Sequence, residues 1–201
     1  MVRKVAVSSF LGNFIEWFDY ASYSYFATTI ALVFFPTDNH TVAMLQTFGV
    51  FALSFILRPI GALFWGSYGD KKGRKAALAH SIMFMSGASF LIGCLPSYSV
   101  IGVGAPILLL LLRMVQGFSA SGEYAGAATF LGEYAPTSKR GIYCSLIPAS
   151  TAIGLLAGST LATLMTANMN SSAMVGWGWR VPFLLAGPLG LIVLYIRAKL
   201  A

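Results

Sequence analysis

Charged side chains are scarce in this sequence of 201 residues. They make up 9% of it, and Asp and Glu together number six, whereas ordinary soluble domains are about a quarter charged. That scarcity excludes a typical soluble domain. Hydrophobic residues make up 57% of the chain, in long runs without the alternation of barrel strands. Because only helices and closed barrels satisfy their backbone in lipid, the sequence predicts an all-α integral membrane protein.

Cysteine and histidine are also few. Cys94 and Cys144 fall in different apolar runs and have no metal-ligand spacing. His40 lies in a predicted loop, and His80 lies far in depth from Ser119, the serine that an intramembrane hydrolase would need. We therefore expect no metal, no cofactor and no enzyme activity. An intramembrane enzyme and a purely structural membrane subunit stay as minor alternatives.

The apolar runs and the polar breaks between them predict six transmembrane helices in one bundle covering residues 1–201. Their expected ranges are about 5–35, 42–69, 76–95, 105–134, 142–167 and 180–197. Arg3 and Lys4 resemble the start of a signal peptide. However, Glu16 and Asp19 interrupt the apolar core that such a peptide requires, so we expect the first helix to be retained.

Basic residues gather on one side of the predicted bundle. The formal net charge is +7, but its distribution follows the positive-inside rule and does not suggest nucleic-acid binding. The predicted connections of the other side carry only Arg180. Both termini are therefore expected in the cytoplasm. The basic residues assigned to that side are Arg3, Lys4, Lys71, Lys72, Arg74, Lys75, Lys139, Arg140, Arg197 and Lys199.

Five charged residues lie inside predicted spans: Glu16, Asp19, Arg58, Arg113 and Glu123. A charge at the centre of a spanning helix costs roughly 2.5 to 3.5 kcal/mol even on the lenient insertion scale. Such residues persist where they face a partner or a water-filled cavity. Their presence indicates passage of an ion or a solute.

Two polar stripes carry most of these charges. On the first helix, Asn13, Glu16, Asp19, Tyr20 and Tyr23 fall within one arc. We interpret this stripe as a cavity lining with a titratable carboxylate; the alternative is a structural ion pair that locks the bundle.

The fourth helix carries the second stripe, with Arg113, Gln116 and Glu123 on one face. Arg113 and Glu123 are separated by about 15 Å of helix, so each needs a partner on another helix. Estimated depths favour pairing Arg58 with Glu123 or Glu16. They also favour, less strongly, a pair between Arg113 and Asp19.

A glycine-containing basic turn follows the second helix, Gly66-x-x-x-Asp70-Lys71-x-Gly73-Arg74-Lys75. It resembles the signature of the loop between helices 2 and 3 in the major facilitator superfamily. Other segments resemble the metabolite:proton symporter family within it, in order along the whole chain. They are residues 12–20 (GNFIEWFDY), 58–61 (RPIG), 113–119 (RMVQGFS), 122–124 (GEY), 133–136 (EYAP) and 177–183 (WGWRVPF).

The resemblance implies the N-terminal half of a twelve-helix transporter in a bacterial inner membrane, in which protons drive uptake of a small polar metabolite. The likeness is greatest to porters of proline/betaine-type osmolytes; porters of organic acids such as citrate, 2-oxoglutarate or shikimate are the alternative. It also implies that the turn at Gly66, Asp70, Lys71, Gly73, Arg74 and Lys75 gates the cytoplasmic side, with Glu133 approaching Arg74. A truncated half would be inactive alone unless it pairs with a second six-helix half or with itself.

Overall fold

Helices account for nearly all of the computed structural model, which describes residues 1–199. No strand occurs within that range. The longer helices are α1 (Val2–Tyr25), α2 (Ala27–Phe34), α3 (His40–Ile56), α4 (Arg58–Lys72), α5 (Arg74–Cys94), α7 (Gly104–Ala120), α8 (Glu123–Tyr134), α10 (Leu146–Asn168) and α12 (Arg180–Ala198). The short ones are α6 (Tyr98–Ile101), η1 (Thr137–Lys139), α9 (Arg140–Cys144), α11 (Ser171–Ala173) and η2 (Met174–Gly178), the last a π-helical turn.

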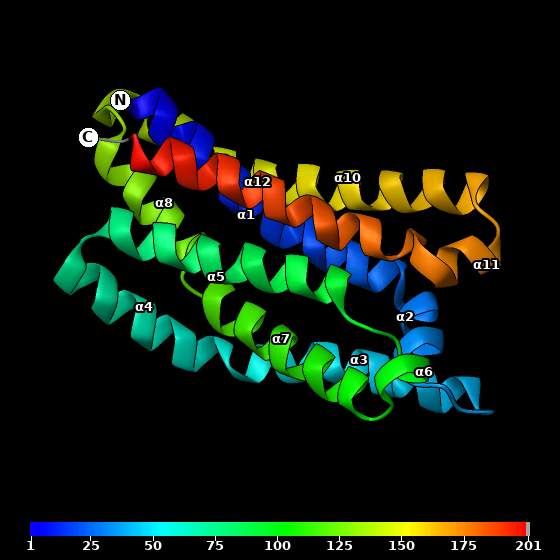
Figure 1. Ribbon diagram of the computed structural model, residues 1–201. Coiled ribbons are helices and arrows are strands. Elements are labelled where there is room, and N and C mark those ends of the chain that lie inside the picture. Colours follow the sequence, from blue (N-terminus) through cyan, green and yellow to red (C-terminus); the bar gives the residue numbers. More distant parts are fainter. Residues whose placement is uncertain (200–201) are drawn as a thin grey trace.

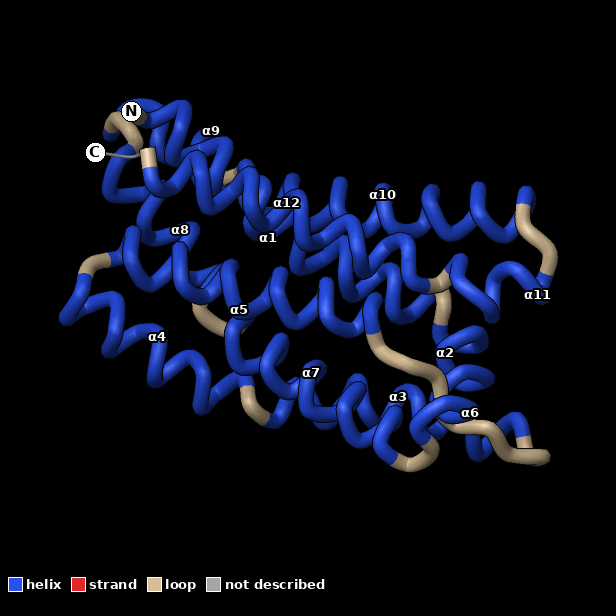
Figure 2. The backbone as a smooth tube through the Cα atoms, in the orientation of Figure 1, coloured by secondary structure: helices blue, strands red, loops and turns tan. Residues whose placement is uncertain are grey.

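These helices form six rods, and the first, second and fourth rods are each divided into two helices. α1 and α2 are separated at Phe26, α3 and α4 at Leu57, and α7 and α8 at residues 121–122. Figure 2 shows short linkers at these points. Pro59 is the second residue of α4, where its missing N–H removes no helical hydrogen bond. From sequence, each interrupted rod is predicted as one continuous span.

The rod that begins with α1 runs through the middle of the bundle. α1 packs along α10 and α12 and against α8, while α5 packs along α12 and α7. α3 lies along α7, and α4 contacts both α5 and α7. In Figure 1, α10 and the α3–α4 rod form opposite edges, with α1, α5, α7 and α12 between them.

Apolar side chains cover the outside of the bundle, and polar ones occupy much of its interior. Leu63 is 79% exposed, for example, while Asn13, Ser89 and Arg113 are wholly buried. This arrangement suits a hydrocarbon solvent, in which apolar surface needs no cover and polar groups must find partners inside. The molecule therefore has the distribution expected of a membrane-embedded bundle.

Five segments within the described residues are long and apolar enough to cross a membrane: His40–Lys72, Arg74–Cys94, Gly104–Tyr134, Thr137–Asn168 and Ser171–Ala198. The rod formed by α1 and α2 is not among them. Its α1 portion carries the polar stripe and is largely enclosed by other helices. The six helical rods lie close to the ranges predicted from sequence, while their membrane boundaries stay predictions.

The start of α1 and the end of α12 lie at the same end of the bundle as the α4–α5 turn (Figure 1). The basic clusters at residues 3–4 and 71–75 therefore share one end of the molecule.

Candidate functional site

An ion pair between Asp19 on α1 and Arg113 on α7 lies in the interior of the bundle. Arg113 Nη1 is 2.6 Å from Asp19 Oδ2, and the arginine side chain is fully buried. Asp19 Oδ1 also accepts hydrogen bonds of 3.1 Å from Ser89 Oγ and from Gln116 Nε2. The predicted pair of Asp19 with Arg113 is therefore present, and Gln116 belongs to the same network.

The Arg113 guanidinium is only partly satisfied by this network. Its Nε and Nη2 atoms are buried and have no hydrogen-bond partner among the described residues, and the same holds for Gln116 Oε1. Aromatic rings supply the remaining contacts, with the guanidinium carbon 4.3 Å from the Tyr23 ring centroid and 5.2 Å from that of Phe51. A buried cation with unused donors can accept a further anionic or polar partner.

A second ion pair joins α1 to the break in the α3–α4 rod. Arg58 Nη2 is 2.5 Å from Glu16 Oε1 and also donates to the Tyr20 hydroxyl. The Arg58 side chain is 27% exposed, whereas Glu16 is buried and its Oε2 has no partner among the described residues. Of the two acids that the sequence offered to Arg58, the structure selects Glu16.

Glu123 pairs instead with Arg197, near the end of α12. Both side chains are 1% exposed. Arg197 Nη1 and Nη2 each donate to a Glu123 oxygen, and Ser81 Oγ donates to Glu123 Oε2 at 3.1 Å. Arg197 further donates to the backbone carbonyls of Leu78 and Ser8. This pair thus ties α12 to α1, α5 and α8.

Arg197, counted from sequence among the basic residues of the cytoplasmic side, is one of the most deeply buried side chains. Its position two residues before Lys199 made it resemble an interfacial anchor. The sequence carried one sign of this burial. Three acidic but only two basic residues were placed inside the membrane, so one of the acids had no basic partner. Glu123 is also the first residue of α8, where the positive end of the helix dipole stabilises a carboxylate.

Close backbone approach makes room for the Arg197–Glu123 pair. A Cβ added to Gly12 would lie 2.6 Å from Arg197 Nη2 and would also collide with the Glu123 carboxylate. Any larger residue at position 12 would therefore displace the pair.

The five residues of the predicted α1 stripe do not share one environment. Asn13 Nδ2 donates to α10, at 3.0 Å from the Ile147 carbonyl and 2.8 Å from the Ser150 hydroxyl. Tyr23 donates from its hydroxyl to the Thr47 carbonyl on α3, at 2.8 Å. Asn13 therefore ties α1 to α10. The interpretation of the stripe as the lining of one cavity does not apply to this residue. Glu16, Asp19 and Tyr20 take part in the two ion-pair networks.

The basic turn between α4 and α5 has a backbone geometry that requires a glycine. Gly73 has φ of 95°, a conformation that L side chains rarely adopt. Arg74 forms an ion pair with Asp70, Nη2 to Oδ1 at 3.0 Å. Both partners are substantially exposed, so the pair adds at most about 1 kcal/mol. Lys71 lies in the last turn of α4, and a Cβ at Gly66 would meet nothing within 4 Å.

Comparisons with known proteins identify a transporter family. The family model described as "Sugar (and other) transporter" matches residues 4–200. The glycine betaine/proline/ectoine/pipecolic acid transporter OusA of Dickeya dadantii is 44% identical over 199 residues, covering 99% of this chain and 40% of that protein. The proline/betaine transporter of Escherichia coli K12 is 43% identical, also over 99% of this chain and 40% of its own length.

Solved structures show the same fold. A partially occluded, inward-open structure of the xylose transporter XylE from E. coli matches all of this chain and 48% of its own, with a TM-score of 0.88 at 17% identity. A proton:xylose symporter XylE structure bound to 6-bromo-6-deoxy-D-glucose gives a TM-score of 0.86 at 16% identity. The chain thus spans about 40% of the length of its curated relatives. It belongs to the sugar (and other) transporter family of the major facilitator superfamily and has the fold of that superfamily's N-terminal six-helix half.

Proposed function

We propose that this chain forms the N-terminal half of a proton-coupled symporter for a small polar metabolite, with Asp19 and Arg113 at the centre of its transport route. The observation that carries the proposal is the buried Asp19–Arg113 pair, whose guanidinium retains unused donors. Fully satisfied pairs are enough to lock a bundle, so an incompletely satisfied one favours a second partner.

Proton coupling follows from the chemistry of this pair. A proton on Asp19 removes its negative charge and leaves the Arg113 cation buried without a counter-ion. Breaking a buried pair in this way costs about 3–5 kcal/mol. An incoming carboxylate would restore the missing charge, so that protonation of Asp19 and solute binding at Arg113 favour one another.

An osmolyte of the proline/betaine type fits the surroundings of both pairs. These solutes carry a carboxylate, which Arg113 would bind, and a positively charged nitrogen. Aromatic faces attract such cations, quaternary ammonium groups in particular. The rings of Tyr20, Phe51 and Phe55 lie together, with centroids 5.2–5.7 Å apart. Tyr20 and Phe55 already contact the Arg58 guanidinium, and Phe51 contacts that of Arg113. The relatives named as proline/betaine transporters support this assignment.

An organic acid is the second candidate substrate. Arg58 is the observation that favours it, since its guanidinium is 27% exposed and could bind a further carboxylate. Two arginines, Arg58 and Arg113, would then bind a dicarboxylate or tricarboxylate such as citrate.

The membrane location and the gating of the cytoplasmic side belong to the same proposal. The chain lies in a bacterial inner membrane with both termini in the cytoplasm, as the shared basic end supports, and the turn containing Asp70 and Arg74 gates that side together with Glu133. Alternating access rocks one half of a transporter against the other. A second six-helix half, or a second copy of this chain, would therefore complete the solute site.

A chimera tests the transport role. Residues 1–199 would replace the matching half of the E. coli proline/betaine transporter, and labelled proline, glycine betaine or citrate would be offered to proteoliposomes. We expect accumulation of proline or betaine under an inward proton gradient, and its loss with a protonophore. Asp19→Asn should abolish accumulation, whereas Asp38→Asn, at an exposed acid in the α2–α3 linker, should not. Accumulation of citrate alone would select the second candidate, and gradient-independent uptake would refute proton coupling.

A further inference from the structure

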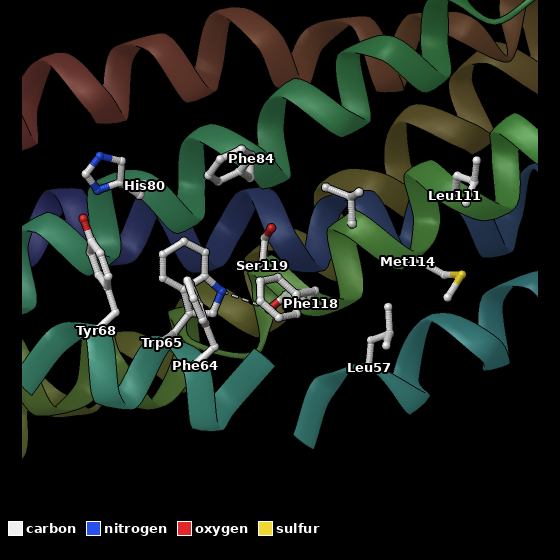
Figure 3. A pocket seen from close by; sticks show the side chains of 11 residues that line it. Leu57, Phe64, Trp65, Tyr68, His80, Phe84, Leu111, Met114, Phe118 and Ser119 are labelled. Carbon is white, nitrogen blue, oxygen red and sulfur yellow. Dashed lines mark hydrogen bonds between the residues drawn. The ribbon is translucent and has the colours of Figure 1, made fainter. Parts of the chain in front are cut away.

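A groove of about 560 Å³ opens between α4, α5 and α7 (Figure 3). None of the intramembrane charged residues lines it, so it is separate from the proposed transport route. Its wall includes Phe64, Phe84 and Leu111, each close to half exposed. The groove is therefore an apolar hollow open to the surroundings of the bundle.

Polarity changes along the length of the groove. Tyr68 and His80 lie at one end, edge to face, with ring centroids 5.7 Å apart. Leu111 and Met114 lie at the opposite end, and Phe84 and Trp65 lie between (Figure 3). The groove thus runs along the helices, from two rings that carry polar atoms to a purely aliphatic end.

Basic side chains stand beyond the polar end. Lys71 and Lys72 follow Tyr68 by three and four residues on α4, so they share its helix face one turn nearer the end of the bundle. Arg74 and Lys75 begin α5, about one and a half turns before His80. With Asp70 as the single acid, this turn carries four basic residues and a positive charge.

We propose that the α4–α5–α7 groove binds one acyl chain of an anionic phospholipid, with the headgroup against the basic turn at residues 71–75. The basic turn, the polar end and the apolar end of the groove follow one another in the same order as the parts of a phospholipid. Those parts are the charged headgroup, the ester groups and the hydrocarbon chain. In a membrane-spanning bundle the apolar wall faces lipid, and a basic cluster at the membrane surface attracts anionic headgroups. Ser119, on the groove floor, is buried and adds no polar surface to the apolar part.

Lipid retention by the purified chain tests the headgroup contact. Native mass spectrometry would compare binding of dioleoyl phosphatidylglycerol and dioleoyl phosphatidylcholine, and phosphate alone would serve as a headgroup without a chain. Each basic residue near an anionic lipid strengthens binding roughly fivefold. We therefore expect Lys71→Gln with Lys72→Gln to weaken phosphatidylglycerol binding about 25-fold and to leave phosphatidylcholine unchanged. Arg3→Gln with Lys4→Gln, on α1 away from the groove, is the matched control.

A second pair of variants tests the acyl-chain contact. Val115 lines the groove and is 39% exposed, whereas Leu108, on the same helix, is 40% exposed and lies outside the set of lining residues. Val115→Trp should displace about two methylene groups of the chain and weaken retention of phosphatidylglycerol about tenfold. Leu108→Trp should bind as the unmodified chain does.

Fluorescence of the unmodified chain avoids the risk that a variant with a filled groove misfolds. Trp65 lines the groove, so phosphatidylglycerol with brominated acyl chains should quench its emission, and Trp65→Phe should remove that part of the quenching. Equal retention of the two lipids, equal effects of Val115→Trp and Leu108→Trp, binding of phosphate as strong as that of the lipid, or quenching unchanged in Trp65→Phe would each overturn the proposal. So would a second six-helix unit that covers the groove and leaves no lipid bound.

Discussion

Replacing Arg197 with methionine should destabilise the bundle more than any change at its surface. Methionine keeps the length and apolar stem of arginine but removes every hydrogen bond to the Glu123 carboxylate except that from Ser81. The backbone carbonyls of Leu78 and Ser8 lose a donor but remain within helices. The main effect is therefore a buried carboxylate without a counter-ion, which costs about 3–5 kcal/mol. That corresponds to a shift of roughly 150- to 4,000-fold in the unfolding equilibrium.

Unfolding in mixed micelles, followed by loss of helical circular dichroism as sodium dodecyl sulfate is added, measures this free energy. Lys199→Met is the matched control, because Lys199 is exposed at the same end of α12 and should change stability by less than about 0.5 kcal/mol. Arg197→Met combined with Glu123→Leu removes both charges and should return to within about 1 kcal/mol of the unmodified chain. A single variant as stable as the control, or a double variant as unstable as the single one, would refute the assignment of a buried pair.

Two smaller changes test helix packing by the same assay. Gly117→Ala would bring a Cβ to 2.8 Å from the carbonyl carbon of Ser54, so α3 and α7 must separate and the bundle should lose about 1–3 kcal/mol; Gly87→Ala, with nothing within 4 Å, should be neutral or stabilising. Tyr23→Phe removes the hydrogen bond to the Thr47 carbonyl and should cost about 0.5–1.5 kcal/mol; no loss there would show that this bond is not maintained in the membrane.

The helical fold was predictable from the sequence, because each apolar run and each polar turn is a local signal. The turn at Gly73 and the ion pair of Asp19 with Arg113 were also foreseen, the latter because a buried charge requires a partner of opposite sign. The interruptions at Leu57 and at residues 121–122 were missed. Both sites carry polar or helix-breaking residues, since Arg58 and Pro59 follow Leu57, and residues 121–122 are Ser and Gly. Those signals were outweighed by the apolar residues on either side.

The partners of Glu123 and Asn13 were beyond the reach of sequence reasoning for a different reason. Helical phase gives the direction of a side chain on its own helix, but not which other helix lies there. Asn13 bonds to residues of α10 more than 130 positions away, and Glu123 bonds to Arg197, 74 positions away. Contacts between residues so far apart in the sequence cannot be read from local composition.

The polarity of α1 has a consequence for biosynthesis. This helix is synthesised before α10, yet Asn13 finds its hydrogen-bond partners on α10 only after about 137 further residues. At about 5–20 residues per second, synthesis of that stretch takes roughly 7–27 seconds. During that time α1 must stay beside the translocon or an insertion chaperone rather than move into lipid alone. The bundle is then assembled around α1 by the helices that follow it in the chain.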